Sequence, residues 1–293
     1  MWTETIHVIP PYNFDLVLDR LSNDPLHAVD TSGRSILVPL YVKEEPIAVK
    51  VQAAGTTDSP SFRISGDREP QREEAMERIK KIFGWHLPLE NIQNHFESSA
   101  LKGIFQEHRG TPLILDFDPY GCLVKCIVHQ QLNLKFAYTL TARYVKAYGF
   151  QVDGAWFYPP PQKAAKLSVA DLRELQFSAR KAEYLIGISQ LIADGELNIR
   201  ELSSEPDEIV IEQLTKIRGI GRWTAENFLL FGLGRPNLFP KADIGIQNAI
   251  KNLFDLEKKP TQEQMDTYSE GWNPYLSYAS LYLWRSIEKR SET

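Results

Sequence analysis

Residues 214–225 read Leu-Thr-Lys-Ile-Arg-Gly-Ile-Gly-Arg-Trp-Thr-Ala, and the interpretation of the whole chain starts from this stretch. It predicts two helices joined by a tight turn, because glycine accepts positive φ and lets backbone approach another group closely. The second helix begins at Arg222, and free backbone N–H groups at such a start bind anions, most often phosphate. An αα-hairpin whose glycines serve only packing gives the same pattern. The turn alone therefore leaves both interpretations open.

Positive charge is concentrated around this turn. The chain of 293 residues has a net charge of -5, which argues mildly against a surface built throughout for nucleic acid. Between Gln213 and Lys251, however, six basic side chains accompany only two acidic ones. The sequence predicts one basic region in an acidic protein.

The composition is that of a globular protein, with 43% hydrophobic and 24% charged residues. It excludes a disordered chain, a collagen and a secreted disulfide scaffold, and the length suggests about two domains. The longest apolar stretches, 36–42 and 228–233, are far shorter than the roughly 18 residues that a membrane span needs. The N-terminus lacks the pattern of a signal peptide, and the chain has only two cysteines, Cys122 and Cys126. We expect a cytoplasmic protein without a membrane partner.

The hydrophobic periodicity predicts an α+β chain with a small N-terminal antiparallel β-sheet and helix domain, residues 1–85, before an all-α part, residues 86–293. The all-α part is expected to have two lobes, 113–235 with the hairpin at 218–222, and 86–112 plus 236–293. Strands are predicted at 5–8, 35–42 and 47–52. A helix is predicted to begin after about Glu69 and to end at Gly84. Further helices are predicted at 14–21, 120–148 in one or two pieces, 168–172, 179–194, 206–217, 222–231, 244–254, 261–270 and 274–290.

Four further segments accompany the hairpin in a fixed order. They are Ile-Val-His-Gln-Gln-Leu at 127–132, the helical segment 175–185, and Phe-Pro-Lys-Ala-Asp-Ile-Gly at 239–245 followed by the aromatic segment 272–284. Together with the hairpin they resemble the helix-hairpin-helix DNA glycosylase superfamily over more than half of the chain. The strand-rich N-terminus is similar to the extra domain of its alkylated-base branch, the 3-methyladenine DNA glycosylase II type.

The resemblance implies a role for Asp243, which occupies the place of the family's catalytic aspartate. Its sequence context also makes it a good helix N-cap. A carboxylate bonded by backbone amides at a helix start suits a group that stabilises an oxocarbenium-like transition state and positions water. Asp243 is therefore the predicted catalytic residue.

The resemblance also implies binding residues. The hairpin residues Arg218, Gly219, Ile220, Gly221 and Arg222 would grip the DNA backbone. Trp223 and Trp284 match positions of the base pocket, where aromatic rings suit a cationic base, although an aromatic residue on a helix is more often part of the core. Gln131 and Leu132 match the wedge that fills the gap left by a flipped base. Some members of the family have an apolar residue where this chain has Gln131, so either Gln131 or Leu132 is the predicted wedge.

Two features argue against strand cleavage and against an iron–sulfur cluster. The family's lyase members have a lysine nucleophile at the position of Trp223, and the cluster members need four cysteines near the C-terminus. Two departures from the family pattern are Leu276, where a basic residue is frequent, and Arg218, where proline is common. No metal site of protein side chains is expected, and the two cysteines are expected to be buried.

The sequence thus predicts a monofunctional DNA glycosylase that excises 3-methyladenine, with 7-methylguanine as a further candidate. The partner is double-stranded DNA with a damaged base, and the protein is expected to be a monomer associated with the bacterial nucleoid during repair. No organic cofactor is indicated, and the resemblance implies a monovalent cation at the hairpin. Three alternatives remain: a non-catalytic DNA-binding module, a lyase that uses Lys241, and a hairpin scaffold for protein partners.

Overall fold

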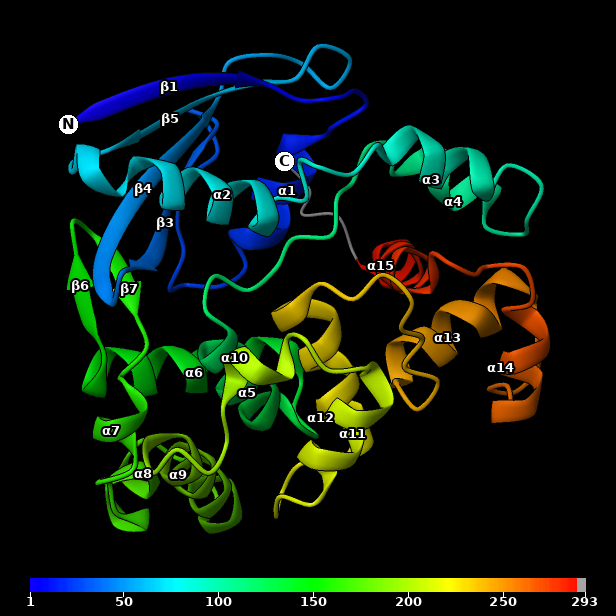
Figure 1. The fold of residues 1–293 in the computed structure, drawn as a ribbon. Helices are drawn as coiled ribbons and strands as arrows, with labels where there is room; N and C mark the ends of the chain where they lie inside the picture. Colours follow the sequence, from blue (N-terminus) through cyan, green and yellow to red (C-terminus); the bar gives the residue numbers. More distant parts are fainter. Residues whose placement is uncertain (289–293) are drawn as a thin grey trace.

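The computed structural model describes residues 1–288 of the chain. A five-stranded antiparallel sheet forms the N-terminal part, in the order β1-β5-β4-β3-β2 (Figure 1). Its elements are β1 (Trp2–His7), α1 (Phe14–Leu21), β2 (Ala28–Asp30), β3 (Ser35–Val42), β4 (Glu45–Ala53) and β5 (Ser61–Gly66). The α+β class with a small antiparallel N-terminal part is confirmed.

The central strands form because apolar residues alternate along them. Val38 of β3 pairs with Val49 of β4, and Ile36 pairs with Val51, and all four side chains are buried. Such alternation places one face of a strand in the core. The predicted strands 35–42 and 47–52 are confirmed, and β2 and β5 are additional strands that the sequence analysis missed.

The remaining chain is mostly helical. Its helices are α2 (Arg72–Ile82), α3 (Leu89–His95), α4 (Lys102–Glu107), α5 (Pro119–His129), α6 (Leu134–Tyr148), α7 (Pro161–Ala164), α8 (Val169–Glu174), α9 (Ala179–Ala193), α10 (Ile199–Leu202), α11 (Asp207–Thr215), α12 (Arg222–Asn227), α13 (Ile244–Leu253), α14 (Gln262–Tyr268) and α15 (Leu276–Ile287). The predicted segment 120–148 is two helices, because the chain turns at residues 130–133 before Asn133 caps α6. The 3₁₀ turn Glu69–Gln71 precedes α2, and a π-helical segment, Phe228–Leu233, continues α12. The predicted end of the last helix at Arg290 lies outside the described residues.

The helical part also contains a β-hairpin, which the sequence analysis assigned to no strand. Strand β6 (Phe150–Val152) pairs with β7 (Ala155–Phe157), and the two turn residues, Asp153 and Gly154, both have positive φ. An Asp-Gly pair between apolar residues is a strong signal for this kind of turn. The pattern was therefore present in the sequence, but it covers too few residues to stand out among helices.

The helices form two groups in Figure 1, with α7, α8 and α9 in one and α13, α14 and α15 in the other, and α5, α11 and α12 lie between them. The buried side chains form two clusters. The larger one joins the N-terminal sheet to α2–α4 and to the C-terminal helices, and the smaller one lies among α5, α6, α8 and α9. The predicted boundaries of the domain and its lobes stay a prediction.

Candidate active site and nucleic-acid interface

Asp243 is the N-cap of α13, and three N–H groups orient its carboxylate. Oδ1 accepts from the backbone N–H of Ile246 at 3.0 Å and from Nε1 of Trp284 at 2.8 Å. Oδ2 accepts from Nε1 of Trp223 at 2.8 Å. Bonds to an ionised acceptor are stronger than neutral ones. The carboxylate is therefore held in one orientation by its own helix and by two tryptophans from α12 and α15.

The two tryptophans line a cavity of about 290 Å³ together with Asp243. This volume lies at the lower end of the roughly 300–1,000 Å³ typical of small-molecule pockets. Trp223 and Trp284 use their indole edges to bind Asp243, which the sequence analysis did not anticipate; stacking on a base stays a prediction for both. The described residues that line the cavity do not include Trp272, Tyr275 or Tyr278.

The N-terminal part contributes one side of the cavity. Leu16, Val17 and Arg20 of α1 all line it. The Arg20 guanidinium lies 5.2 Å from the centre of the Phe231 ring, and that ring lies 5.7 Å from the Trp284 ring. Contacts therefore run from α1 through Phe231 to one of the tryptophans that hold Asp243.

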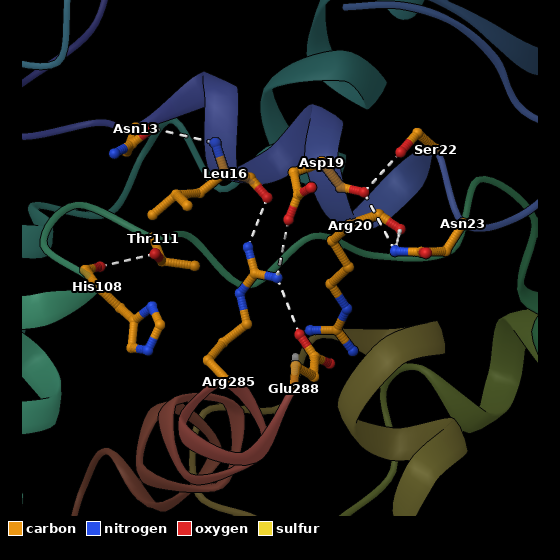
Figure 2. A network of polar contacts seen from close by, with 10 residues as sticks. All are labelled: Asn13, Leu16, Asp19, Arg20, Ser22, Asn23, His108, Thr111, Arg285 and Glu288. Carbon is orange, nitrogen blue, oxygen red and sulfur yellow. Dashed lines mark hydrogen bonds and ion pairs between the residues drawn. The ribbon is translucent and has the colours of Figure 1, made fainter. Parts of the chain in front are cut away.

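Arg285, the residue after Trp284, joins α15 to α1 directly (Figure 2). Its side chain is only 5% exposed; Nη2 donates to the carbonyl oxygen of Leu16 at 2.6 Å, and Nη1 lies 2.9 Å from Oε2 of Glu288. Asp19 lies 3.9 Å from the same Nη1. A buried arginine needs such partners, because an unpaired buried charge is costly. Arg285 therefore holds the N-terminal helix against the helix that carries Trp284.

A buried ion pair forms another part of the cavity wall. Nζ of Lys125 on α5 donates to Oδ1 of Asp116, and both residues line the cavity. Burial favours the neutral form of each group, but their mutual attraction outweighs it. The pKa of Asp116 is consequently below, and the pKa of Lys125 above, its ordinary value. The pair is therefore ionic.

Two histidines beside this pair are neutral. Burial, with a smaller contribution from Lys125, lowers the pKa of His129 to about 3. Burial also lowers the pKa of His27. His129 lies 3.2 Å from Oγ1 of Thr141, and His27 lies 3.0 Å from the carbonyl oxygen of Leu21. The sequence analysis gave none of these four side chains a role, although His129 lies in the block 127–132, and no local signal would have placed them in one cavity.

The hairpin between α11 and α12 depends on Gly219. This residue has φ of 91°, and a Cβ there would lie 2.1 Å from the ring of Tyr184. Gly221 is different, because a Cβ added to it would meet no described atom within 4 Å. The fold requires the first glycine, whereas the second leaves open space at the N-terminus of α12.

The two arginines that flank the turn are exposed and bound to carboxylates. Arg218 lies 2.9 Å from Glu183 and has 78% of its side chain exposed, and Arg222 lies 2.8 Å from Glu226 with 63% exposed. Exposed pairs of this kind are weak in water. The guanidinium of Arg218 can therefore exchange its partner for a phosphate at small cost. Glu226 is only 8% exposed, so a move of Arg222 to a phosphate would leave a buried carboxylate without its cation.

The segment after α5 connects the cavity to the hairpin. Nε2 of Gln130 donates to the carbonyl oxygen of Gly219 at 2.9 Å and to Oγ1 of Thr224 at 2.8 Å. Gln131 is exposed with φ of 56°, and Leu132 lines the cavity. The two candidate wedge residues thus occupy different places, Gln131 on the surface and Leu132 at the cavity.

Lys181 of α9 stabilises the end of α5. Its ammonium group donates to the carbonyl oxygens of Ile127, Val128 and Gln130 at 2.9, 2.8 and 2.7 Å. A cation at a helix C-terminus satisfies carbonyls that have no partner within the helix. This lysine lies in a block that the sequence analysis matched to the family, but it was not assigned a role.

We expect Lys181→Met to lower the free energy of unfolding by about 1–3 kcal/mol, because three carbonyl groups lose a charged donor. The amides of residues 131–133 should exchange with solvent faster than in the wild type. Chemical denaturation and hydrogen exchange measure the two effects. Lys166→Met, at an exposed position, is the control and should change neither. Unaltered exchange at 131–133 in the Lys181 variant would contradict this role.

Gly245, the second residue of α13, leaves room for the bonds of Asp243. A Cβ there would lie 3.0 Å from Oδ1 of Asp243 and 3.0 Å from Cδ1 of Trp284. Alanine is the better helix former by roughly 0.5–1 kcal/mol. Glycine at position 245 therefore makes the start of α13 less stable than alanine would, but it leaves space for the Asp243 carboxylate and the Trp284 indole.

We expect Gly245→Ala to slow base excision by about tenfold, because a small displacement of a reacting group has a large effect on rate. Single-turnover excision and thermal unfolding should be measured together. Gly187→Ala is the matched control, since Gly187 lies in α9 and a Cβ there meets nothing within 4 Å. An unchanged rate in the Gly245 variant would show that the carboxylate tolerates the shift.

No group of three or more His, Cys, Asp or Glu side chains in residues 1–288 could hold a metal ion. Cys122 and Cys126 are free thiols and buried, as expected. Within the same residues, every helix is too short or too polar to cross a membrane.

Comparison with known families identifies the class of this protein. Residues 124–274 match the family model described as HhH-GPD superfamily base excision DNA repair protein. This range contains the hairpin, Trp223 and Asp243. The chain belongs to this superfamily. The prediction from the hairpin and its accompanying blocks is confirmed.

The relatives place the chain in the alkylated-base branch. A Bacillus subtilis (strain 168) protein, YfjP, with the provisional name DNA-3-methyladenine glycosylase, is 55% identical over 98% of this chain and 100% of its own. The structure of a 3-methyladenine DNA glycosylase from Archaeoglobus fulgidus has a TM-score of 0.85 and 24% identity, over 98% of this chain and 99% of its own. The 3-methyladenine DNA glycosylase of Schizosaccharomyces pombe, solved with abasic DNA, is 28% identical with a TM-score of 0.61, over 69% of this chain and 100% of its own.

Proposed function

We propose that this chain is a monofunctional DNA glycosylase that flips alkylated purines, 3-methyladenine above all, out of duplex DNA and hydrolyses their N-glycosidic bond. The observation that carries the proposal is the Asp243 carboxylate, held by two indole N–H groups at a cavity suited to one base. Family membership and the names of the relatives support the same activity.

Asp243 acts on the sugar rather than on the base. A cationic alkylpurine is already a good leaving group, so cleavage needs stabilisation of the positive charge that develops on the sugar. A fixed carboxylate supplies it without reorganisation, and it also orients or deprotonates the attacking water. Because the indole groups and the α13 amide set its direction, the geometry exists before DNA binds.

The hairpin would bind the DNA backbone next to this site. The N-terminus of α12 and the open space at Gly221 suit a phosphate, and Arg218 and Arg222 flank it. We propose a monovalent cation at the hairpin carbonyls. The carbonyl of Gly219 already accepts from Gln130, and its second lone pair is available to such an ion.

Gln131 is the wedge that we propose, because it is exposed on the segment anchored to the hairpin by Gln130, whereas Leu132 faces the cavity. A side chain must fill the gap of the flipped base from the surface. Leu132 would then contact the base itself. We propose further that the protein acts as a monomer on nucleoid DNA.

The lysines near the site do not support lyase activity. Lys241 is paired with Asp266, and Lys125, which does line the cavity, is held in its charged form by Asp116. A Schiff base requires a neutral amine. Borohydride trapping on DNA with an abasic site should therefore give no covalent adduct.

The test is release of free base from a duplex that contains one 3-methyladenine, followed by a gel without alkali. Release with an intact strand is the expected result. Salt-sensitive binding to the duplex without release would favour a non-catalytic DNA-binding module. Absence of any DNA affinity would favour a scaffold for protein partners, and strand breaks with a trapped adduct would show a lyase.

A further inference from the structure

Three cationic side chains in residues 1–288 line the cavity of the candidate site. Lys125 is paired with Asp116, and Arg285 is paired with Glu288 (Figure 2). The third cation, Arg20 of α1, is half-buried and forms no ion pair with a carboxylate of the described residues. A charge that is partly removed from water without a counter-ion costs free energy. Arg20 at the cavity wall therefore indicates a group that is kept for a bound ligand.

The contacts of Arg20 place it in one row with the candidate catalytic carboxylate. Its Cζ lies 5.2 Å from the centre of the Phe231 ring. That ring lies 5.7 Å from the ring of Trp284, and Nε1 of Trp284 donates to Oδ1 of Asp243 at 2.8 Å. All four residues line the cavity. One wall thus presents a guanidinium, two aromatic rings and a carboxylate in this order.

The charge of Arg20 is felt elsewhere in the same cavity. Tyr138 of α6 also lines it. Burial raises the pKa of Tyr138, and the positive charges of Lys125 and Arg20 oppose that increase. The position of Arg20 is supported one turn earlier on α1, where the carbonyl oxygen of Leu16 accepts from Arg285. Residues four apart share a face of a helix, so this bond keeps the face that carries Arg20 against the cavity.

We propose that Arg20 is a second catalytic residue, which lies against the flipped base and stabilises the electron pair that moves onto it; this inference rests on the proposed function. A base that stacks on the rings of Phe231 and Trp284, with its sugar at Asp243, has its far end toward Arg20. The two charged groups at the ends of the wall then act on opposite ends of the bond that breaks.

The electron balance of the reaction explains why a cation helps. The C1′–N9 bond breaks with its electron pair on the base, so a cationic alkylpurine leaves as a neutral molecule. The oxygen of water bonds to C1′, and the proton that water loses passes to Asp243 and then to solvent. During cleavage the sugar gains positive charge and the base loses it. Asp243 favours the first change and Arg20 favours the second, both without reorganisation.

The repulsion between Arg20 and a cationic base gives this role a kinetic signature. The base carries its full positive charge in the bound substrate and less of it in the transition state, so the guanidinium disfavours the former relative to the latter. An interaction that differs between these two states changes the rate of the chemical step. Removal of the charge should therefore slow cleavage without weakening the binding of the substrate.

Two other roles for Arg20 predict different results, and three variants separate them. The guanidinium could bind a DNA phosphate, or it could only pack on Phe231 through a cation–π contact. Arg20→Met removes the charge and keeps an unbranched side chain, whereas Arg20→Lys keeps the charge. Lys50→Met, at an exposed position of β4, makes the same change in net charge and is the control.

The experiment measures single-turnover excision of 3-methyladenine from a duplex over a range of protein concentrations. For Arg20→Met we expect the rate constant at saturation to fall by about tenfold, with an unchanged or lower concentration for half-saturation. Arg20→Lys should stay within about threefold of wild type, because the charge remains. Neither Arg20 variant should change the affinity for DNA with an abasic-site analogue, which contains no base, and Lys50→Met should change nothing. Thermal unfolding is recorded for each protein.

An unchanged saturated rate in Arg20→Met would overturn the proposal, and so would an equal loss in Arg20→Lys. Weaker binding to abasic DNA with a smaller salt dependence would overturn it in favour of a phosphate contact. Losses in every measurement, in step with a lower unfolding temperature, would overturn it in favour of packing. If the wild type excises no alkylated purine, the proposed function fails; if it excises 3-methyladenine and Arg20→Met keeps the rate, only the role of Arg20 fails.

Discussion

The Asp243→Asn variant is expected to release 3-methyladenine at least about a thousandfold more slowly than wild type, because it removes the charge that stabilises the developing cation. Folding should hardly change. Asparagine is as good an N-cap as aspartate, and its Oδ1 can still accept from Ile246 and from Trp284, the bonds that Oδ1 of Asp243 makes.

The amide of the variant introduces one local conflict. Oδ2 of Asp243 accepts from the indole of Trp223, and an NH₂ group at that place would face this N–H, donor against donor. Trp223→Phe is therefore the matched control, since it removes the same bond and keeps the carboxylate. Single-turnover excision and thermal unfolding of both variants separate the charge from its orientation. A rate for Asp243→Asn within tenfold of wild type would rule out Asp243 as the catalytic group.

The second large effect is expected at Gly219. We expect Gly219→Ala to lower the free energy of unfolding by at least about 2 kcal/mol, from the left-handed backbone and from the collision with Tyr184. The carbonyl of Gly219, which Gln130 binds, should move with the turn. The variant should therefore lose DNA affinity as well as stability, as denaturation and fluorescence anisotropy would measure.

Gly221→Ala is the matched comparison within the same turn. Its backbone has φ of -94°, and a Cβ meets no described atom, so stability should not fall. DNA affinity should still decrease, by about tenfold or about 1.4 kcal/mol, because the methyl group occupies the space where a phosphate approaches. Equal behaviour of the two variants in both measurements would mean that the open space at Gly221 is not used by DNA.

Much of the fold follows from local patterns. The strands at 35–42 and 47–52 and the helices around 179–194 and 244–254 were predictable because apolar residues repeat with the period of each structure. The short helices α3 and α4 and the strands β6 and β7 were missed, since three to seven residues hold too few repeats to establish a period.

The candidate site divides in the same way. The N-cap at Asp243 and the glycines of the hairpin have signals within a few residues of themselves. The indole bonds to Asp243 have none, because they join residues 20 and 41 positions away in the chain. Periodicity placed Trp223 and Trp284 on helices without indicating which ring edge would face the carboxylate.

The sequence by itself determined the position of the hairpin and the helix that starts at Asp243, because turn and cap preferences act between near neighbours in the chain. It determined the class of protein through the resemblance of its ordered blocks to a known superfamily. Only the tertiary structure decided that α1 closes one side of the cavity, that two tryptophans orient the carboxylate, and that Lys125 and Asp116 form part of the wall. These contacts depend on how distant helices pack, and packing determines side-chain direction through the combined shape of many residues.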